Sequence, residues 1–273
     1  MNLLIFFIII LLLLFITLVL RNFYKQNNKT KNKIYNIKKD GVTVIKKILS
    51  DEQADNIKQL VEDGYHLEAK KKILTSKTIK NRIKDIFGPD YEFHDYIFII
   101  KKSQFNACHR DYNGTFFNST QKNPSYTIII YLQDMDKCLD VITGSHKHIT
   151  KNMFNITDIT ETVLCTKGDA ILFDANLIHS GSLNKNESNP RIQMKISHIK
   201  DRDDSLKFFQ QYNKILNKKN NQPKWTKNLQ KHLSCIAPII SQFSQKYDNN
   251  KYKETNNNDN IISKLFYAKL ENI

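Results

Sequence analysis

The chain has 273 residues, enough for one sizeable domain with appendages, because single domains commonly run to about 100–200 residues. Lysine and arginine outnumber aspartate and glutamate by 42 to 27, which gives a formal net charge of +15. The basic residues are spread along the chain without a dense arginine stripe, whereas electrostatic binding of nucleic acid needs charge clustered on one face. A nucleic-acid partner is therefore not expected.

The amino-terminal segment, residues 3–20, reads LLIFFIIILLLLFITLVL and is apolar except for Thr17. As a helix it is long enough to cover most of a hydrocarbon core of ~30 Å. A cleaved signal peptide would need a basic start and small residues before the cleavage site, and both are missing. We predict a transmembrane anchor at residues 1–20 and a basic juxtamembrane linker at residues 21–38. Because positive charge follows the apolar run only on its carboxyl side, we expect a single-pass protein whose catalytic domain is cytosolic.

The central region, residues 39–202, is predicted to form one mainly β domain with flanking helices. Its start, DGVTVIKKILS, indicates a short strand, and Ser50 can cap a helix through residues 51–65. Between about residues 90 and 200 the sequence consists of short runs rich in β-branched or aromatic residues, which are YIFIIKK, YTIIIYLQD, ETVLCTK, AILFD and RIQMKISHI. No helical pattern of about 10–15 residues separates these runs. An antiparallel barrel or sandwich is therefore favoured over a parallel α/β sheet.

The last region, residues 203–273, is rich in lysine and asparagine and is predicted to be a helical extension. Two segments carry the helical prediction, DSLKFFQQYNKILNKK and WTKNLQKHLSCIAPIISQF. A flexible break, DNNKYKETNNNDN, then precedes a last short helix, IISKLFYAKL. Such an extension could serve as a basic interaction module for a partner protein or an anionic lipid.

Four cysteines lie far apart in the sequence and form no C-x-x-C pair: Cys108, Cys138, Cys165 and Cys235. This spacing is typical neither of a zinc ribbon nor of a dense disulfide framework. We therefore expect buried, reduced thiols.

The stretch CHRDYNGT, residues 108–115, contains a His-Arg-Asp that admits two interpretations. A protein kinase would need an asparagine five places after the aspartate, a D-F-G and a glycine-rich loop. Position 116 is phenylalanine, no D-F-G occurs, and the chain has seven glycines. The kinase interpretation is excluded.

The second interpretation is a metal site. On an extended strand, His109 and Asp111 point to the same face, so both can bind one ion. The 2-His-1-carboxylate triad of non-haem iron oxygenases needs a second histidine from a distant strand. His179 is favoured because it ends the run GDAILFDANLIHSG beside small residues, which leave room for a ligand. Arg191 opens the next strand, and its guanidinium could hold a dicarboxylate by bidentate pairing. The other histidines considered were His146, His148 and His198.

In this order, the motifs resemble the phytanoyl-CoA dioxygenase family, a branch of the Fe(II)- and 2-oxoglutarate-dependent oxygenases. The likeness runs from about Asp40 to Ile199. It includes the opening strand and helix, the HRD at the family's H-x-D position, YTIIIYLQDMDKCLDVITGSHK, and GDAILFDANLIHSGSLNKNESNPRIQM. Thr143 stands where the family usually has proline.

The resemblance implies a double-stranded β-helix, a jelly-roll or cupin-like core, with Fe(II) held by His109, Asp111 and His179. It implies 2-oxoglutarate as cosubstrate, with its far carboxylate paired to Arg191, and O2 as oxidant, with ascorbate as a possible reductant. Secondary candidates for cosubstrate contact are Ser182, Lys101 or Lys102, and Thr127. Because halogenases of this type replace the carboxylate ligand with a small residue, Asp111 favours hydroxylation.

The expected function is that of a membrane-anchored dioxygenase that hydroxylates an unidentified small molecule or lipid, with an acyl compound as one class, and releases succinate and CO2. The alternative is a catalytically inactive scaffold of the same fold at a membrane. The intact set of predicted ligands argues against that alternative.

Overall fold

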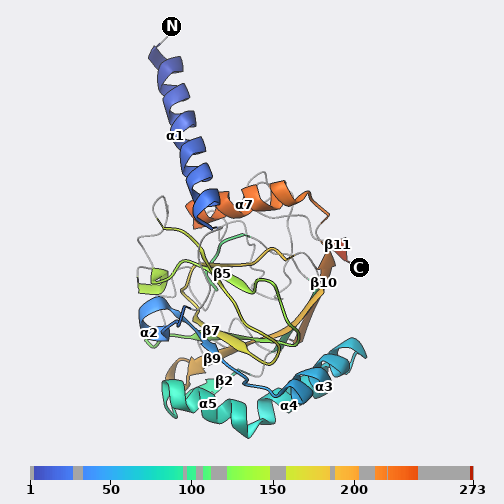
Figure 1. Cartoon of the computed structure of the whole chain (residues 1–273). Coiled ribbons are helices and arrows are strands. Elements are labelled where there is room, and N and C mark those ends of the chain that lie inside the picture. Colours follow the sequence, from blue (N-terminus) through green and yellow to red (C-terminus); the bar gives the residue numbers. More distant parts are fainter. Residues whose placement is uncertain are drawn as a thin grey trace.

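The structure is a computed structural model of the whole chain (Figure 1). It describes residues 3–26, 33–94, 97–102, 107–111, 122–147, 158–184, 188–202, 213–219, 221–238 and 271–272.

Two β-sheets form the centre of the molecule. The larger sheet has eight strands in the order β1-β7-β4-β9-β3-β10-β11, with β2 paired to β9. Its strands are β1 (Val42–Ile45), β2 (Tyr91–Phe93), β3 (Ile97–Lys102), β4 (Tyr126–Tyr131), β7 (Ala170–Asp174), β9 (Ser188–His198), β10 (Asn213–Lys219) and β11 (Glu271–Asn272). The smaller sheet has the order β6-β5-β8, with β5 (Leu139–Val141), β6 (Glu161–Val163) and β8 (His179–Gly181). The expectation of a mainly β core with flanking helices is confirmed, and its two sheets are consistent with a cupin-like jelly roll.

The strands form where the sequence predicts them because each sheet buries alternate side chains. In β4, Ile128 and Ile130 face a hydrophobic cluster shared with three helices, whereas Ile129 and Tyr131 face a second cluster between the sheets. Neighbouring β9 divides in the same way, since Met194 lies in the first cluster. A strand buried on both faces reads as a continuous apolar run, as YTIIIY does.

Three consecutive helices cover the outer face of the larger sheet (Figure 1): α3 (Asp51–Glu62), α4 (His66–Thr75) and α5 (Lys77–Phe87). The predicted cap at Ser50 is present as a capping box, in which the Ser50 hydroxyl accepts from the Gln53 amide. The sequence did not predict α4 or α5. They pack through Ile73, Ile79 and Ile83, and each of these side chains is at most 1% exposed.

The glycine-aspartate turn before β7 also matches the sequence. Gly168 adopts a φ of +81°, and an added Cβ would lie 2.4 Å from the Leu49 carbonyl oxygen, so only glycine fits. Asp169 is fully buried and accepts hydrogen bonds from the backbone amides of Lys47 and Thr166. This turn joins the start of β7 to the end of β1.

The amino-terminal helix α1 (Leu3–Gln26) begins in the predicted anchor and continues into the predicted linker. A short helix, α2 (Ile37–Asp40), then precedes β1. Across the described ranges, no helix has the length and apolar character that a membrane span needs. The structure therefore does not support the predicted transmembrane helix, which stays a prediction from the sequence.

The carboxyl-terminal region differs from the predicted helical extension. Residues 213–219, expected as helix, form β10, which runs parallel to β3 and extends the larger sheet. Pairing with an otherwise open sheet edge overrides the local helical pattern there. The predicted second helix is present as α7 (Lys224–Ile236), while residues 261–270, predicted as a last helix, lie outside the described residues.

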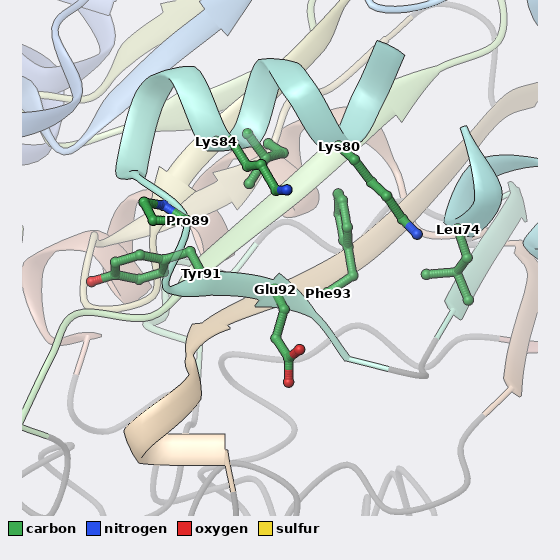
Figure 2. Close-up of a pocket in the computed structure, with 8 residues that line it drawn as sticks. Leu74, Lys80, Lys84, Pro89, Tyr91, Glu92 and Phe93 are labelled. Atoms are coloured by element: carbon green, nitrogen blue, oxygen red, sulfur yellow. The ribbon is translucent and has the colours of Figure 1, made fainter. Parts of the chain in front are cut away.

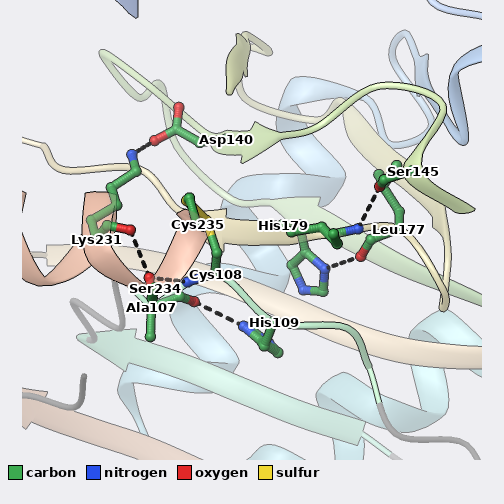
Figure 3. The surroundings of a disulfide bond; sticks show 11 residues. Ala107, Cys108, His109, Asp140, Ser145, Leu177, His179, Lys231, Ser234 and Cys235 are labelled. Carbon is green, nitrogen blue, oxygen red and sulfur yellow. Dashed lines mark hydrogen bonds and ion pairs between the residues drawn. A yellow bond between two sulfur atoms is a disulfide. The ribbon is translucent and has the colours of Figure 1, made fainter. Parts of the chain in front are cut away.

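The expectation of reduced cysteines is wrong for one pair. Cys108 and Cys235 form a disulfide between the segment at residues 107–111 and α7, across a separation of 127 residues (Figure 3). Sequence spacing could not indicate this pair, because the fold alone brings the two residues together. Cys138 and Cys165 are free and buried.

Candidate metal centre

The predicted ligands come from two segments that pair side by side. The backbones of His109 and His179 exchange two hydrogen bonds, each of 2.9 Å between amide nitrogen and carbonyl oxygen. This antiparallel bridge adds residues 107–111 to the edge of the smaller sheet beside β8. Two positions 70 residues apart in the sequence thus become neighbours.

The side chains of His109, Asp111 and His179 converge on one point. Their potential ligand atoms all lie within 4.8 Å of one another. Asp111 Oδ1 is 3.8 Å from His109 Nε2 and 3.6 Å from His179 Nε2. The three side chains are between 5% and 15% exposed, so the site is sheltered but not sealed.

A backbone carbonyl oxygen beside each Nδ1 fixes the orientation of each imidazole (Figure 3). His109 Nδ1 lies 3.0 Å from the Ala107 carbonyl oxygen, and His179 Nδ1 lies 3.0 Å from that of Leu177. Because a carbonyl oxygen can only accept, each Nδ1 carries the proton and each Nε2 keeps its lone pair for a metal. Burial lowers the pKa of His179 to about 3, an effect that the nearby His109 strengthens, so this ring stays neutral at physiological pH.

Asp111 is held in the ionised form. Burial by itself raises the pKa of its carboxyl group, but the ammonium group of Lys195, which also donates a hydrogen bond to it, outweighs burial and brings the pKa well below its ordinary value. Thr127, predicted as a cosubstrate contact, instead donates a hydrogen bond of 2.5 Å from Oγ1 to Asp111 Oδ2. Thr127 thus lies at the site in direct contact with a predicted ligand.

Arg191 lies on the inner face of the larger sheet, opposite Tyr131 on β4. Its guanidinium donates to the Asn189 carbonyl oxygen at 3.1 Å, and burial lowers its pKa. Within the described part of the chain, no carboxylate pairs with Arg191. A partly buried cation without an acidic partner suits an anionic ligand.

The remaining predicted contacts are not brought to the three ligands by any described interaction. Lys102 ends β3, opposite Ser188. Ser182 follows β8, and its buried hydroxyl has no hydrogen-bond partner among the described residues. His146 lies near Lys38, and His198 lies near Asp90, while His148 falls outside the described residues.

Two residues near the site were not identified from the sequence. Lys195 forms an ion pair with Asp111, and its signal was the alternation of RIQMK, which places positions 191 and 195 on one face. The second residue is Arg110, whose buried guanidinium donates to the carbonyl oxygens of Ser145 and Asn176. The Ser145 hydroxyl accepts a hydrogen bond from the Ile178 amide, so this network links the segment that carries His109 and Asp111 to the segment that carries His179.

A separate pocket of about 460 Å³ lies between α4, α5 and β2 (Figure 2). Its lining comprises Leu74, Lys80, Ile83, Lys84, Pro89, Tyr91, Glu92 and Phe93. None of these is a predicted site residue.

The chain was compared with protein-family models, with curated protein sequences and with solved structures. Residues 51–192, just over half of the chain, match the family model described as "Phytanoyl-CoA dioxygenase (PhyH)". The match spans all the predicted ligands and Arg191. No curated protein sequence matches the chain.

Among solved structures, the chain is similar to the non-haem α-ketoglutarate-dependent epimerase SnoN from nogalamycin biosynthesis, with 14% identity, a TM-score of 0.48, and coverage of 59% of this chain and 78% of that one. It is also similar to HygX from Streptomyces hygroscopicus with nickel, 2-oxoglutarate and hygromycin B bound. That match has 12% identity, a TM-score of 0.46, and coverage of 59% and 84%.

Proposed function

Because this chain belongs to the phytanoyl-CoA dioxygenase family, we propose that it is a hydroxylase that holds Fe(II) with His109, Asp111 and His179. The observation that carries the proposal is the convergence of two imidazoles and one carboxylate within 4.8 Å, on segments that the fold pairs directly. Family membership confirms the predicted enzyme class, an Fe(II)- and 2-oxoglutarate-dependent oxygenase, and the family's cofactors.

The donor set fits this ion. Two imidazoles and one carboxylate form the facial triad of non-haem iron oxygenases, which leaves coordination positions open. When bound, the iron and 2-oxoglutarate supply the oxidising power that inserts an oxygen atom from O2 into a C–H bond. The protein holds the two Nε2 lone pairs and Asp111 Oδ1 toward one point and keeps most water away from them.

Arg191 is the proposed partner of the far carboxylate of 2-oxoglutarate. It projects from the inner face of β9, four residues from Lys195, and Lys195 contacts Asp111. Its guanidinium has a planar arrangement of donors that matches a carboxylate. Succinate and CO2 are the expected coproducts.

The substrate and the membrane anchor rest on the sequence. Residues 3–20 are apolar except for Thr17, and a basic segment follows them. We propose that this segment attaches the enzyme to a membrane, and that a lipid or acyl compound is the substrate class favoured by that location. The basic segment favours the cytosolic side for the catalytic domain, whereas the Cys108–Cys235 disulfide is typical of an oxidising compartment, so the proposal covers the attachment and not the side.

The proposed activity is tested on the full chain with Fe(II), ascorbate and labelled 2-oxoglutarate, by measuring succinate. We expect slow succinate formation without added substrate by the wild type, and at least about a hundredfold less with Asp111→Ala, because the variant lacks a ligand. Asp55→Ala, which removes a mostly exposed aspartate of α3 instead of a ligand, is the matched control. A wild-type chain that binds neither Fe(II) nor 2-oxoglutarate would instead indicate the inactive scaffold.

A further inference from the structure

The two oxygens of the Asp111 carboxylate have different surroundings. Oδ1 faces the two imidazole nitrogens, at 3.6 and 3.8 Å. Oδ2 faces away from them and accepts hydrogen bonds from the Thr127 hydroxyl and the Lys195 ammonium group. One oxygen is therefore directed at the candidate metal position, and the other is occupied by the protein.

The fold places Lys195 for this contact. Thr127 on β4 and Lys195 on β9 are directly opposite in the antiparallel register, so their side chains leave the sheet side by side. Lys195 is 5% exposed, and its Nζ lies 2.6 Å from Thr127 Oγ1. Burying an ammonium group is costly unless a charge compensates it, and Asp111 provides that charge.

We propose that Lys195, supported by Thr127, is a positioning residue that holds Oδ2 so that Asp111 presents Oδ1 alone to the iron. The inference rests on the proposed function and adds to it a role for two residues behind the ligand. A protonated lysine has three donors and no lone pair, so Lys195 orients the carboxylate without itself competing as a ligand.

The consequence concerns the number of free positions at the ion. An ion held by two imidazoles and one carboxylate oxygen would keep coordination positions free for cosubstrate and oxygen. A carboxylate free to turn can bind through both oxygens and take one more position. By occupying Oδ2, Lys195 keeps that position available for 2-oxoglutarate.

Lys195 is distinct in role from Arg191 on the same strand face. Lys195 is already paired with a carboxylate, whereas Arg191 pairs with none in the described residues. The cosubstrate carboxylate therefore belongs to Arg191.

The test uses the full chain loaded anaerobically with Co(II), whose visible spectrum reports its coordination. The spectrum is recorded, and 2-oxoglutarate is titrated into the Co(II) protein by calorimetry. For Lys195→Met we expect a changed spectrum and 2-oxoglutarate binding weaker by about tenfold, in line with the loss of other groups that orient ligands. Lys195→Arg keeps the charge and is expected to restore most of the affinity.

Lys231→Met is the matched control, because Lys231 is also a buried lysine paired with a buried aspartate, Asp140, on the other sheet. We expect the control to keep the wild-type spectrum and affinity. Thr127→Val removes only the hydroxyl group, and we expect it to change the spectrum and the 2-oxoglutarate affinity in the same direction as Lys195→Met but by less. This variant keeps the inference testable if Lys195→Met does not fold.

Unchanged spectra and affinities in Lys195→Met and Thr127→Val would overturn the inference, as would an equal loss in Lys231→Met. A wild-type chain that binds no Co(II) would overturn both the inference and the proposed function. If the wild type binds Co(II) and 2-oxoglutarate and the Lys195 and Thr127 variants bind them equally well, the inference is overturned but the proposed function is not.

Discussion

At the level of single residues, the sequence identified the groups whose chemistry is rare and missed those that act through others. His109, Asp111 and His179 could be proposed because their order and spacing match the H-x-D and distal-histidine motifs of a known family. Lys195 shares a strand face with Arg191 in the sequence pattern, but a lysine within a strand is usually solvated, and only the register of β4 and β9 shows that it contacts Asp111. Arg110 was missed because its acceptors, the carbonyl oxygens of Ser145 and Asn176, are distant in sequence and only the fold brings them to it.

Asp174, at the end of β7, is expected to make the stability of the protein depend on pH. The side chain is buried, and burial raises its pKa from 3.8 to about 6, against the opposing effects of the Asn176 amide and Arg110. A carboxyl group with a raised folded-state pKa contributes stability below its unfolded pKa and loses it as the pH rises through about 6. The wild type should therefore lose about 3 kcal/mol of stability between pH 3 and pH 7 relative to Asp174→Asn, since one pKa unit corresponds to about 1.4 kcal/mol.

Urea denaturation of both proteins across this pH range measures the difference. The side-chain oxygen of asparagine can still accept from the Asn176 amide, so both proteins keep the hydrogen bond that measures 2.8 Å in the wild type. A difference in unfolding free energy that does not change with pH would contradict the predicted titration.

At the level of elements, periodicity predicted the strands that are buried on both faces and failed where long-range contacts decide. The runs at β3, β4, β7 and β9 correspond to observed strands because their apolar content is high and local. Residues 213–219 were read as helix because nothing in their own sequence reveals the edge of β3 that they pair with. The helix α7 was predicted, but its burial was not, because its buried face contains lysine, glutamine and histidine and no apolar stripe.

The attachment of α7 can be measured. Cys235 bonds to Cys108, and the neighbouring Ser234 hydroxyl accepts from the Cys108 amide at 2.7 Å. A cross-link that closes so long a loop restricts the unfolded chain and contributes up to about 4–5 kcal/mol in the chain-entropy treatment. We expect the melting temperature of the wild type to fall when dithiothreitol is added, whereas Cys235→Ala melts at the lower temperature with or without it. Equal melting of the untreated wild type and the variant would show that the disulfide contributes nothing.

At the level of the whole molecule, the sequence predicted a domain between residues 39 and 202, and the structure adds that the following region is built into it. β10 lengthens the larger sheet, and α7 contacts the smaller one through the ion pair of Lys231 with Asp140. The basic residues Lys227 and Lys231 of α7 are buried, so they are not part of an exposed basic surface. A charge count along the sequence cannot distinguish buried lysines from lysines on an exposed basic surface.

The amino-terminal helix leads to a prediction for the whole chain. The side chains from Ile5 to Ile16 are large, apolar and between 37% and 63% exposed, and a continuous apolar surface of this kind is unfavourable in water. If residues 3–20 anchor the protein, the expressed chain should stay in the membrane pellet after alkaline carbonate extraction. Replacing Leu11 and Leu12 together with lysine should release most of it, because each charge costs about 2.5–3.5 kcal/mol at the centre of a membrane helix. Replacing both with isoleucine is the matched control and should leave the protein in the pellet. Release of the wild type by carbonate would show that the segment does not anchor the enzyme, whereas Co(II) binding, which depends on residues beyond 100, should be the same in all three proteins.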